Sequence, residues 1–329
     1  MLGETVQKVL LVIIILLCLN YVTVVLVGRL LKRPLNTNAL TEGFASEDKA
    51  EGGSLHVWLD NTHLYDKFYA DIYDELTSSS NRNRASAALC MSRWKAKTDP
   101  ARISLLDIGC GTGNAAIGFA KLGMGKVTGL DVSTAMIEKS KENQRNEKGA
   151  ENLPISWRVA DASDPGAAHE NEFTHATLFY FSIYYLKDKQ AFFKNLNRWL
   201  SPGGSVCVEV VNKYKFDPMF QSAAPFLGFS LQKYTKQRMN TSKIVFNKFS
   251  YEGTFNLLEE GDKAEAAEFR EVITFKDSST VRRQKHSFYM PEIKDIIKAA
   301  DAAGFQYMGY QDMMGLGFEY AYLLFFDKH

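Results

Sequence analysis

The chain has 329 residues, of which 46% are hydrophobic and 23% are charged. This composition is typical of a globular protein with a substantial core and excludes a disordered or fibrous chain. Its 39 Lys and Arg residues nearly balance 38 Asp and Glu residues, so the basic excess of a nucleic-acid-binding protein is missing. The four cysteines, at positions 18, 90, 110 and 207, are too scattered for a disulfide framework, and no cluster has metal-ligand spacing.

The first segment of the chain is strongly apolar. Residues 9–27 read VLLVIIILLCLNYVTVVLV and carry no charge over 19 positions, which is long enough for a helix to cross a bilayer. We expect one transmembrane helix within residues 1–31. A cleaved signal peptide is the alternative, although no small-residue cleavage site follows the run. Arg29, Lys32 and Arg33 come next and, by the positive-inside rule, place the rest of the chain in the cytoplasm.

The remainder divides into a linker and a folded domain. Residues 32–54 are polar and lack apolar periodicity, which predicts a flexible linker before a domain over 55–329. Helices are predicted over 58–76, 82–94, 114–122, 133–146 and 189–200, and strands over 103–108, 126–130, 155–160, 173–179 and 205–211. Strands that alternate with helices in this way predict an α/β fold, in which a parallel sheet carries helices on both faces.

The last third of the chain follows another pattern. Three successive strands are predicted over 243–258, 266–275 and 281–289, with charged residues between apolar ones, which indicates a half-solvated antiparallel layer. A helix over 291–303, with Pro291 as its first residue, precedes two final strands over 305–310 and 319–326. Residues 213–248 also hold seven Lys and Arg against Asp217 alone, which suggests a surface that attracts anionic lipid or phosphate.

The strongest motif lies where the first parallel strand ends. Residues 105–113 read LLDIGCGTG, with glycines at 109, 111 and 113 and an aspartate at 107. Glycines let the backbone turn sharply and pass close to a ligand, and the helix that follows presents free amides to that ligand. The spacing G-x-G-x-G differs from the G-x-G-x-x-G of dinucleotide-binding folds. The run closely resembles motif I of the class I S-adenosylmethionine (SAM)-dependent methyltransferases.

The resemblance covers residue 55 to the C-terminus. It implies a Rossmann-like seven-stranded sheet, with 212–290 as an antiparallel lid that recognises the methyl acceptor. Asp131 ends the second strand, where the family's acidic residue accepts both ribose hydroxyls, and Met136 takes the place of the family's adenine-packing side chain. The turn at 200–204 (LSPGG) and the final pair of strands also match the family. The SAM-binding residues implied in this way are Asp107, Gly109, Cys110, Gly111, Gly113, Asp131, Val132, Met136, Asp161, Ala162, Tyr180, Tyr65 and Tyr69.

Each of the three acids also has a structural alternative. Asp107 could hold the glycine loop, Asp131 could cap a helix, and Asp161 could begin an Asx turn in DASDP. All three, however, stand at carboxyl ends of strands, where open α/β sheets bind their ligands. The family commonly folds an N-terminal helix over SAM with a tyrosine near it, which is the reason for including Tyr65 and Tyr69. Core packing is the alternative for both tyrosines.

Catalytic residues are harder to recognise in the sequence than cofactor-binding residues. Methyl transfer from a sulfonium is a direct displacement that depends mainly on the orientation of the two reactants, so it requires no fixed sequence motif. The aromatic run after the fourth strand borders the methyl group in the family. Tyr180, Ser182, Tyr184 and Tyr185 from this run are candidate acceptor contacts, and we expect Tyr184 to be catalytic, with core packing as the alternative for any one of these rings. His286 is a candidate base, since its ordinary pKa lies near neutrality. The chain lacks the Asn/Asp-Pro-Pro-aromatic motif of DNA methyltransferases and a catechol-type metal triad.

These features together predict a membrane-anchored methyltransferase whose domain faces the cytoplasm and whose acceptor is a small molecule or lipid at the membrane surface. One alternative is a methyltransferase that acts on a membrane protein. Another is a catalytically inactive SAM-binding scaffold. The oligomeric state does not follow from the sequence.

Overall fold

The computed structural model describes residues 56–61, 63–77, 79–217, 239–258, 265–276 and 280–329. The predicted anchor and linker lie outside these ranges. No helix within them combines the length and the apolar composition that crossing a bilayer requires. Membrane attachment through residues 9–27 therefore stays a prediction.

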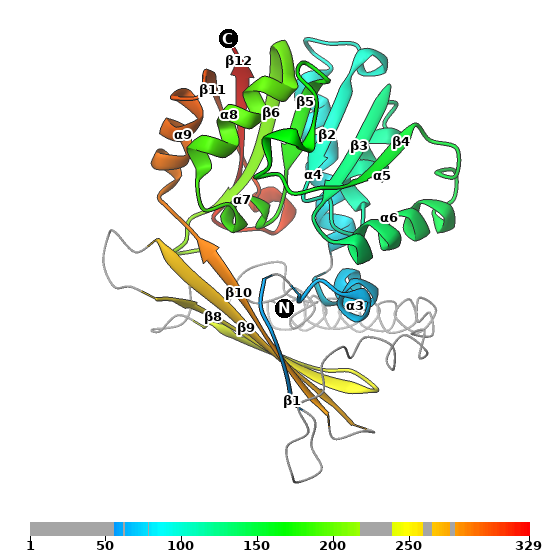
Figure 1. The fold of residues 1–329 in the computed structure, drawn as a ribbon, viewed down its shortest axis with the longest axis vertical. Helices are drawn as coiled ribbons and strands as arrows, with labels where there is room; N and C mark the ends of the chain where they lie inside the picture. Colours follow the sequence, from blue (N-terminus) through cyan, green and yellow to red (C-terminus); the bar gives the residue numbers. More distant parts are fainter. Residues whose placement is uncertain (1–55, 62, 78, 218–238, 259–264, 277–279) are drawn as a thin grey trace, which may run out of the picture. The chain divides into compact units, whose positions relative to one another are not determined.

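Seven strands form one sheet in the order β11-β12-β6-β5-β2-β3-β4 (Figure 1). Strands β4, β3, β2, β5 and β6 run parallel, whereas β12 is antiparallel to both of its neighbours. The α/β prediction is confirmed, and each predicted strand lies within a few residues of its observed position. The strands are β2 (Ser104–Ile108), β3 (Lys126–Asp131), β4 (Ile155–Val159), β5 (Phe173–Leu178), β6 (Leu200–Val211), β11 (Phe305–Asp312) and β12 (Ala321–Lys328).

The strand order explains why helices cover both faces. The chain moves outward from β2 to β3 and β4, then returns to the other side of β2 for β5 and β6. Right-handed crossovers place the helices of these two halves on opposite faces of the sheet. On one face α5 (Asn114–Lys121) contacts both α4 (Ser79–Trp94) and α6 (Thr134–Asn146), and on the other α8 (Lys189–Trp199) packs on α9 (Ile293–Asp301). Glu292 is the N-cap of α9, so Pro291 precedes the cap and is not the first helical residue.

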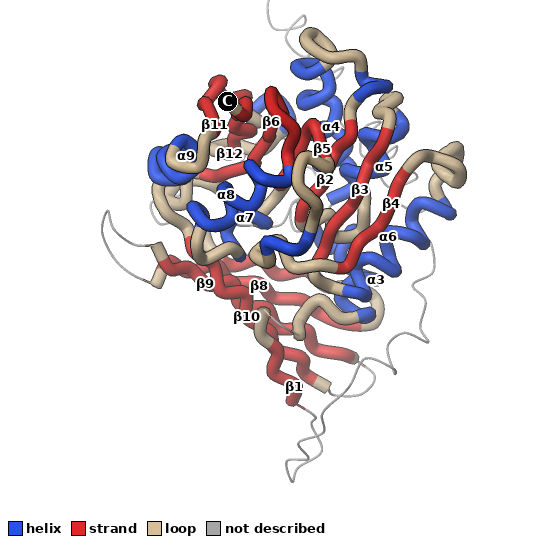
Figure 2. Tube along the Cα trace, turned by 45° about the horizontal axis from the view of Figure 1, so that its top comes forward, coloured by secondary structure: helices blue, strands red, loops and turns tan. Residues whose placement is uncertain are grey.

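A second sheet has the strand order β1-β10-β9-β8-β7 and lies near α3 (Lys67–Thr77) and α7 (Ser182–Tyr185) (Figure 2). Along β8 and β10, and over most of β9, buried side chains alternate with half-buried or exposed ones, as predicted for a half-solvated layer. The predicted strand over 243–258 is in fact two strands, which reverse direction between residues 245 and 249. The five strands are β1 (His56–Leu59), β7 (Thr241–Val245), β8 (Phe249–Leu257), β9 (Ala266–Phe275) and β10 (Val281–Tyr289).

The predicted helix over 58–76 is wrong in its first half. Residues 56–59 form β1, which pairs in parallel with β10 and so adds a fifth strand to the second sheet. The helix, α3, starts at Lys67 because the carboxylate of Asp66 accepts a hydrogen bond from the Tyr69 amide at 3.0 Å and caps the first turn. The strand that pairs with β1, β10, lies more than 200 residues away in the chain, so the local pattern of apolar residues gave no indication that residues 56–59 form a strand.

Polar contacts join the second sheet to the rest of the domain. Arg282 of β10 forms a 2.7 Å ion pair with Asp66. The ammonium groups of Lys189 and Lys213 donate to the carbonyl oxygens of Tyr289 and Met290 at 2.7 and 2.9 Å. Lys213 is only 3% exposed, so it does not belong to the basic surface predicted over 213–248. Lys233, Lys236 and Arg238 of that run lie outside the described residues.

Gly129 of β3 gives a test of this packing. A β-carbon at this glycine would lie 2.5 Å from the Trp157 ring. We expect Gly129→Ala to lower the free energy of unfolding by about 1–3 kcal/mol, which is the usual cost of overpacking a filled core. A β-carbon at Gly315 meets nothing within 4 Å, so Gly315→Ala should change the value by less than about 0.5 kcal/mol. Urea unfolding measures both, and equal effects would contradict the packing described for Trp157.

Candidate active site

A cavity of about 1090 Å³ opens at the carboxyl ends of the parallel strands, beside the point where the strand order reverses between β2 and β5. Open α/β sheets bind ligands at this position. We call the part lined by Gly109, Cys110, Gly111, Asp131, Met136 and Asp161 the glycine-loop end. The part lined by Tyr65, Tyr185, Phe255, Phe269, His286 and Phe288 is called the aromatic end. The cavity therefore spans both sheets.

The glycine loop follows β2 and forms one wall of the cavity. Gly109 and Gly111 have φ angles of +65° and +53°, a region that side-chain-bearing residues adopt only with strain. Both line the cavity together with Cys110, whose thiol pKa is raised by burial. Gly113 does not line the cavity. Instead, its φ is +83° and a β-carbon there would lie 2.5 Å from the Trp157 ring, so this glycine serves helix packing.

Asp131 and Asp161 both line the glycine-loop end. The Asp131 carboxylate accepts hydrogen bonds from the amides of Gly111 at 2.8 Å and Ser133 at 2.9 Å, which ties the loop to the end of β3. Burial raises the pKa of Asp131, and these amide bonds oppose the rise. Asp161 accepts from the Ser163 amide at 2.8 Å, which is the Asx turn considered as its alternative. Both acids thus have a structural task and a position on the wall.

Asp107 differs from these acids because one of its oxygens has no partner. Its Oδ1 accepts from the Thr177 hydroxyl at 2.8 Å, while Oδ2 is buried without a hydrogen bond. Burial raises the pKa of Asp107 to about 7; the Thr177 hydroxyl and the Ala116 backbone amide lower it, and nearby Asp131 raises it. A buried and unsatisfied carboxylate oxygen on a cavity wall suits a cationic ligand group.

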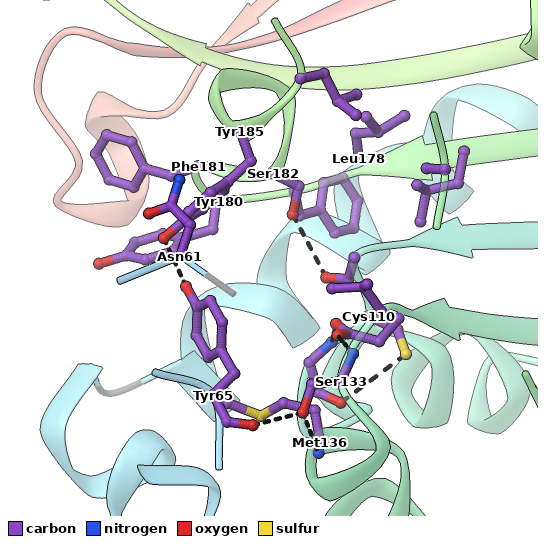
Figure 3. A pocket seen from close by; sticks show the side chains of 18 of the residues that line it. Asn61, Tyr65, Cys110, Ser133, Met136, Leu178, Tyr180, Phe181, Ser182 and Tyr185 are labelled. Carbon is purple, nitrogen blue, oxygen red and sulfur yellow. Dashed lines mark hydrogen bonds between the residues drawn. The ribbon is translucent and has the colours of Figure 1, made fainter. Parts of the chain in front are cut away.

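The remaining residues predicted at this end also lie on the wall. Met136 is buried and lines the cavity beside Val132, which is 63% exposed, and Ala162. Ser133 caps α6, since its hydroxyl accepts from the Met136 amide at 3.1 Å and donates to the Tyr65 carbonyl at 2.6 Å (Figure 3). That contact holds the segment before α3 against the loop after β3.

Tyr180 follows β5 and lines the cavity in a strained conformation. Its φ is +55°, which is rare for a residue with a side chain and costs roughly 1–2 kcal/mol. Burial raises the pKa of its hydroxyl to about 12. The Arg82 guanidinium lies 5.0 Å from the centre of the Tyr180 ring and is ion-paired with buried Glu209. Strain of this kind persists at ligand sites where the surroundings enforce it.

Tyr184 lies elsewhere than predicted. It is 1% exposed, does not line the cavity, and its hydroxyl accepts a hydrogen bond from the Val211 amide at 2.8 Å. The predicted catalytic role therefore lacks the geometry it needs. Because α7 turns successive side chains to different faces, it is the neighbouring Tyr185 that lines the cavity.

Four side chains at the aromatic end form a continuous hydrogen-bonded chain. The hydroxyls of Tyr65 and Tyr185 are 2.7 Å apart (Figure 3). The Tyr185 hydroxyl is 2.5 Å from Nδ1 of His286, and Nε2 of His286 is 2.6 Å from Glu271. Tyr69, by contrast, donates directly to Glu271 at 2.8 Å. The structure thus brings together Tyr65, Tyr69, Tyr185 and His286, which the sequence indicated separately, and adds Glu271.

Glu271 is fully buried and accepts hydrogen bonds from His286, Gln284, Tyr251 and Tyr69. Burial by itself raises its pKa, but the charge and hydrogen bond of His286, with the other donors, lower it below the usual value. Burial also raises the pKa of Tyr65 and Tyr185, so both phenols stay neutral at physiological pH.

Comparison with known proteins agrees with this geometry. The sequence profile of a family described as "Methyltransferase domain" matches residues 105–204, which run from β2 into β6. The chain carries a SAM-dependent methyltransferase domain. SAM is the cofactor of that domain, and the fold is that of class I methyltransferases.

One sequence relative and two solved structures are similar to the chain. The Bacillus subtilis protein with the name "Putative methyltransferase YqeM" is 27% identical over 155 residues, which cover 46% of this chain and 58% of YqeM. The structure of the CcbJ methyltransferase from Streptomyces caelestis aligns with a TM-score of 0.60 and 14% identity, over 82% of this chain and 99% of CcbJ. SAM-bound CalS10 from Micromonospora echinaspora, an amino pentose methyltransferase, aligns with a TM-score of 0.51 and 17% identity over 78% and 97%. At these identities the two structures support the fold.

The glycine-loop end fits SAM on observations of this chain. The unpartnered oxygen of Asp107 would face a cationic group of the cofactor, and Asp131 would accept from its ribose. No atom lies within 4 Å of a β-carbon built on Gly111, so the backbone there is open to a ligand. When bound, SAM supplies a methyl group on a positively charged sulfur. Asp161, Met136, Val132 and Ala162 also line this end of the cavity.

Sequence reasoning missed Glu271, although a signal was present. In β9 the buried positions alternate through Phe269, Glu271, Ile273 and Phe275, so one carboxylate occupies an apolar series. In β10 the buried positions hold Arg282, Gln284, His286 and Phe288. Polar side chains on the inward face of a strand indicate a buried network.

The pH dependence of SAM binding tests Asp107. Because ionised Asp107 attracts a cation and the protonated acid does not, we expect SAM affinity to increase as the pH rises through about 7. Asp107→Asn should abolish this dependence and weaken binding about tenfold or more at pH 8, from the roughly 1.5–3 kcal/mol of a charge-assisted hydrogen bond. Calorimetry between pH 5 and 8 provides the measurement, with exposed Asp164→Asn as control. A flat profile in the wild-type protein would remove Asp107 from the binding site.

Proposed function

We propose that this protein transfers the methyl group of SAM to a small molecule bound at the aromatic end of the cavity. The supporting observation is that one cavity of about 1090 Å³ continues from the glycine loop to the second sheet. Single-ligand pockets measure about 300–1,000 Å³, so this space accommodates a cofactor and a small acceptor together. CalS10, whose fold is similar, is an amino pentose methyltransferase, which is consistent with an acceptor of this size.

The residues of the chain would act mainly by holding and orienting the two ligands. Asp107, Asp131 and the glycine loop would fix the cofactor so that its methyl group faces the aromatic end. Tyr185 and Phe288, whose ring centres are 5.0 Å apart, would place the acceptor in line with that methyl group. Orientation of this kind supplies much of the rate of a direct displacement. The buried walls also exclude water from the reacting atoms.

Two alternatives remain from the sequence. A catalytically inactive SAM-binding scaffold would need no acceptor space, yet the cavity extends well beyond the glycine loop. A membrane-protein acceptor would have to bring a side chain into the buried aromatic end. The structure gives a small acceptor more support than either, because the lining His286 and Phe288 are only 3% and 6% exposed.

Transfer of labelled methyl groups tests the proposal. Residues 55–329, incubated with labelled SAM and a fractionated metabolite extract, should yield a low-molecular-weight product that is heavier by one methyl group. Asp131→Asn should lower SAM affinity at least tenfold and product formation at subsaturating SAM to a similar degree. Label recovered only in protein would favour the membrane-protein acceptor. SAM binding by calorimetry without any labelled product would favour the scaffold.

We also propose that residues 9–27 anchor the domain to a membrane with residues 32–329 in the cytoplasm, where the tether would raise the concentration of the site near lipid-soluble acceptors. Cell fractionation tests this idea. The full chain should remain in the membrane pellet after a carbonate wash, and a chain that starts at residue 32 should move to the supernatant. Protease added outside intact cells should leave the full-length domain uncut. Release of the full chain by carbonate would contradict the anchor.

A further inference from the structure

We propose that Tyr65, Tyr185, His286 and Glu271 form a proton relay, and that the acceptor is a flat molecule methylated on a ring hydroxyl. This inference rests on the proposed methyltransferase function and names its substrate class. From the sequence, His286 is the one candidate base. The structure adds the carboxylate behind it and the two phenols that connect it to the cavity.

The hydrogen bonds give the relay a direction. Glu271 is a carboxylate, so Nε2 of His286 donates to it across 2.6 Å, and in the neutral imidazole that the relay requires Nδ1 is an acceptor. In this proposed state Nδ1 accepts from the Tyr185 hydroxyl at 2.5 Å, and the Tyr185 oxygen accepts from Tyr65 at 2.7 Å. The Tyr65 oxygen keeps a lone pair for a donor in the cavity. A carboxylate that fixes the tautomer of a histidine base is the arrangement found in catalytic triads.

The location of the four residues supports transport of a proton rather than packing alone. Tyr65, Tyr185 and His286 line the cavity, whereas Glu271 lies behind them and is fully buried. They come from the segment before α3, from α7, from β10 and from β9, so the chain runs from the cavity wall into the second sheet. The other titratable groups near His286 are Tyr69, which donates to Glu271, and Tyr251, which does the same from β8.

The walls of the aromatic end indicate the shape of the acceptor. Phe181 and Phe288 stack with ring centres 5.5 Å apart, and His286 stacks on Phe288 at 5.9 Å. Phe255 and Phe269 also line this end. Aromatic faces of this kind favour a flat, largely apolar ligand.

The acids nearest the relay, Glu271 and Asp66, favour an uncharged hydroxyl over a cationic amine, whereas the other lining acids lie in the glycine loop, at the ends of β3 and β4 and at the start of α8. The Glu271 oxygens already accept from four side chains, and Asp66 on the adjoining wall is paired with Arg282 at 2.7 Å. A cationic amine would therefore find no free carboxylate oxygen at these two residues. A hydroxyl enters uncharged and has to lose its proton, which is the task that the relay can perform.

Methyl transfer in this proposal is a direct displacement at the methyl carbon. The acceptor oxygen forms a bond to the methyl carbon, and the carbon–sulfur bond breaks with its electron pair remaining on sulfur. The acceptor proton moves to Tyr65 while the Tyr65 proton moves to Tyr185 and the Tyr185 proton moves to Nδ1 of His286. The resulting imidazolium faces the Glu271 carboxylate and later loses its proton to solvent.

Two phenols of different acidity, used as methyl acceptors, distinguish a role of these residues in proton transfer from a purely structural role. At about pH 8, 4-methylphenol is neutral and needs a base, whereas 4-nitrophenol is largely ionised and does not. We expect the wild-type protein to methylate both on oxygen. His286→Asn and Tyr65→Phe should lower the rate with 4-methylphenol about a hundredfold or more, as for loss of a general base, and the rate with 4-nitrophenol less than fivefold. Glu271→Gln should act in the same direction through the orientation of His286.

The controls distinguish the failure of this inference from that of the proposed function. SAM affinity by calorimetry should be unchanged in His286→Asn and Glu271→Gln, and exposed His169→Asn should keep both rates. Nitrogen NMR of the cofactor-free protein should show Nε2 of His286 protonated and Nδ1 accepting, a pattern that Glu271→Gln should alter. Equal losses with both phenols would overturn the relay. An extract product methylated on nitrogen, with neither phenol accepted, would overturn the hydroxyl acceptor while the proposed function stands.

Discussion

The burial of one charge, that of Glu271, organises the half of the cavity that faces the second sheet. A buried carboxylate is costly unless donors surround it, and removing one of its partners is strongly destabilising. Here the donors are Tyr69 of α3, Tyr251 of β8, and Gln284 and His286 of β10. The need to satisfy Glu271 therefore ties α3 to the second sheet. It also fixes the imidazole of His286 in the orientation that faces Tyr185.

The glycine-loop end shows the opposite situation, in which polar groups are left incomplete. Asp107 keeps one buried oxygen without a partner, and Tyr180 holds a φ of +55°. Both are unfavourable in the protein by itself, and both occur on the wall of the same cavity. A cationic cofactor would relieve the first, and the Arg82–Glu209 pair beneath Tyr180 supports the second. Sites that bind ligands commonly retain such costs.

Much of the domain was predictable because its signals are local. Buried parallel strands such as 104–108 are apolar on successive residues, and the glycines after them mark the loop. The motif also led to the positions of Asp107 and Asp131 on the cavity wall. The helix predicted over 58–76 was wrong in its first half, and Tyr184 and Gly113 do not line the cavity, because each of these three positions depends on a distant partner. These partners are β10, the Val211 amide and the Trp157 ring.

The amino-acid sequence by itself determined the class of the fold, the cofactor and the residues of the glycine loop, since these depend on short-range patterns of apolar, glycine and acidic residues. Only the tertiary structure decided which polar groups meet at the aromatic end. Tyr65, Tyr185, Glu271 and His286 come from segments up to 221 residues apart, and their contacts depend on how α3, α7 and the second sheet pack together. Hydrogen bonds form only when donor and acceptor come within about 3 Å of each other, and this distance is set by the packing of the elements. The spacing of the residues in the sequence does not predict it.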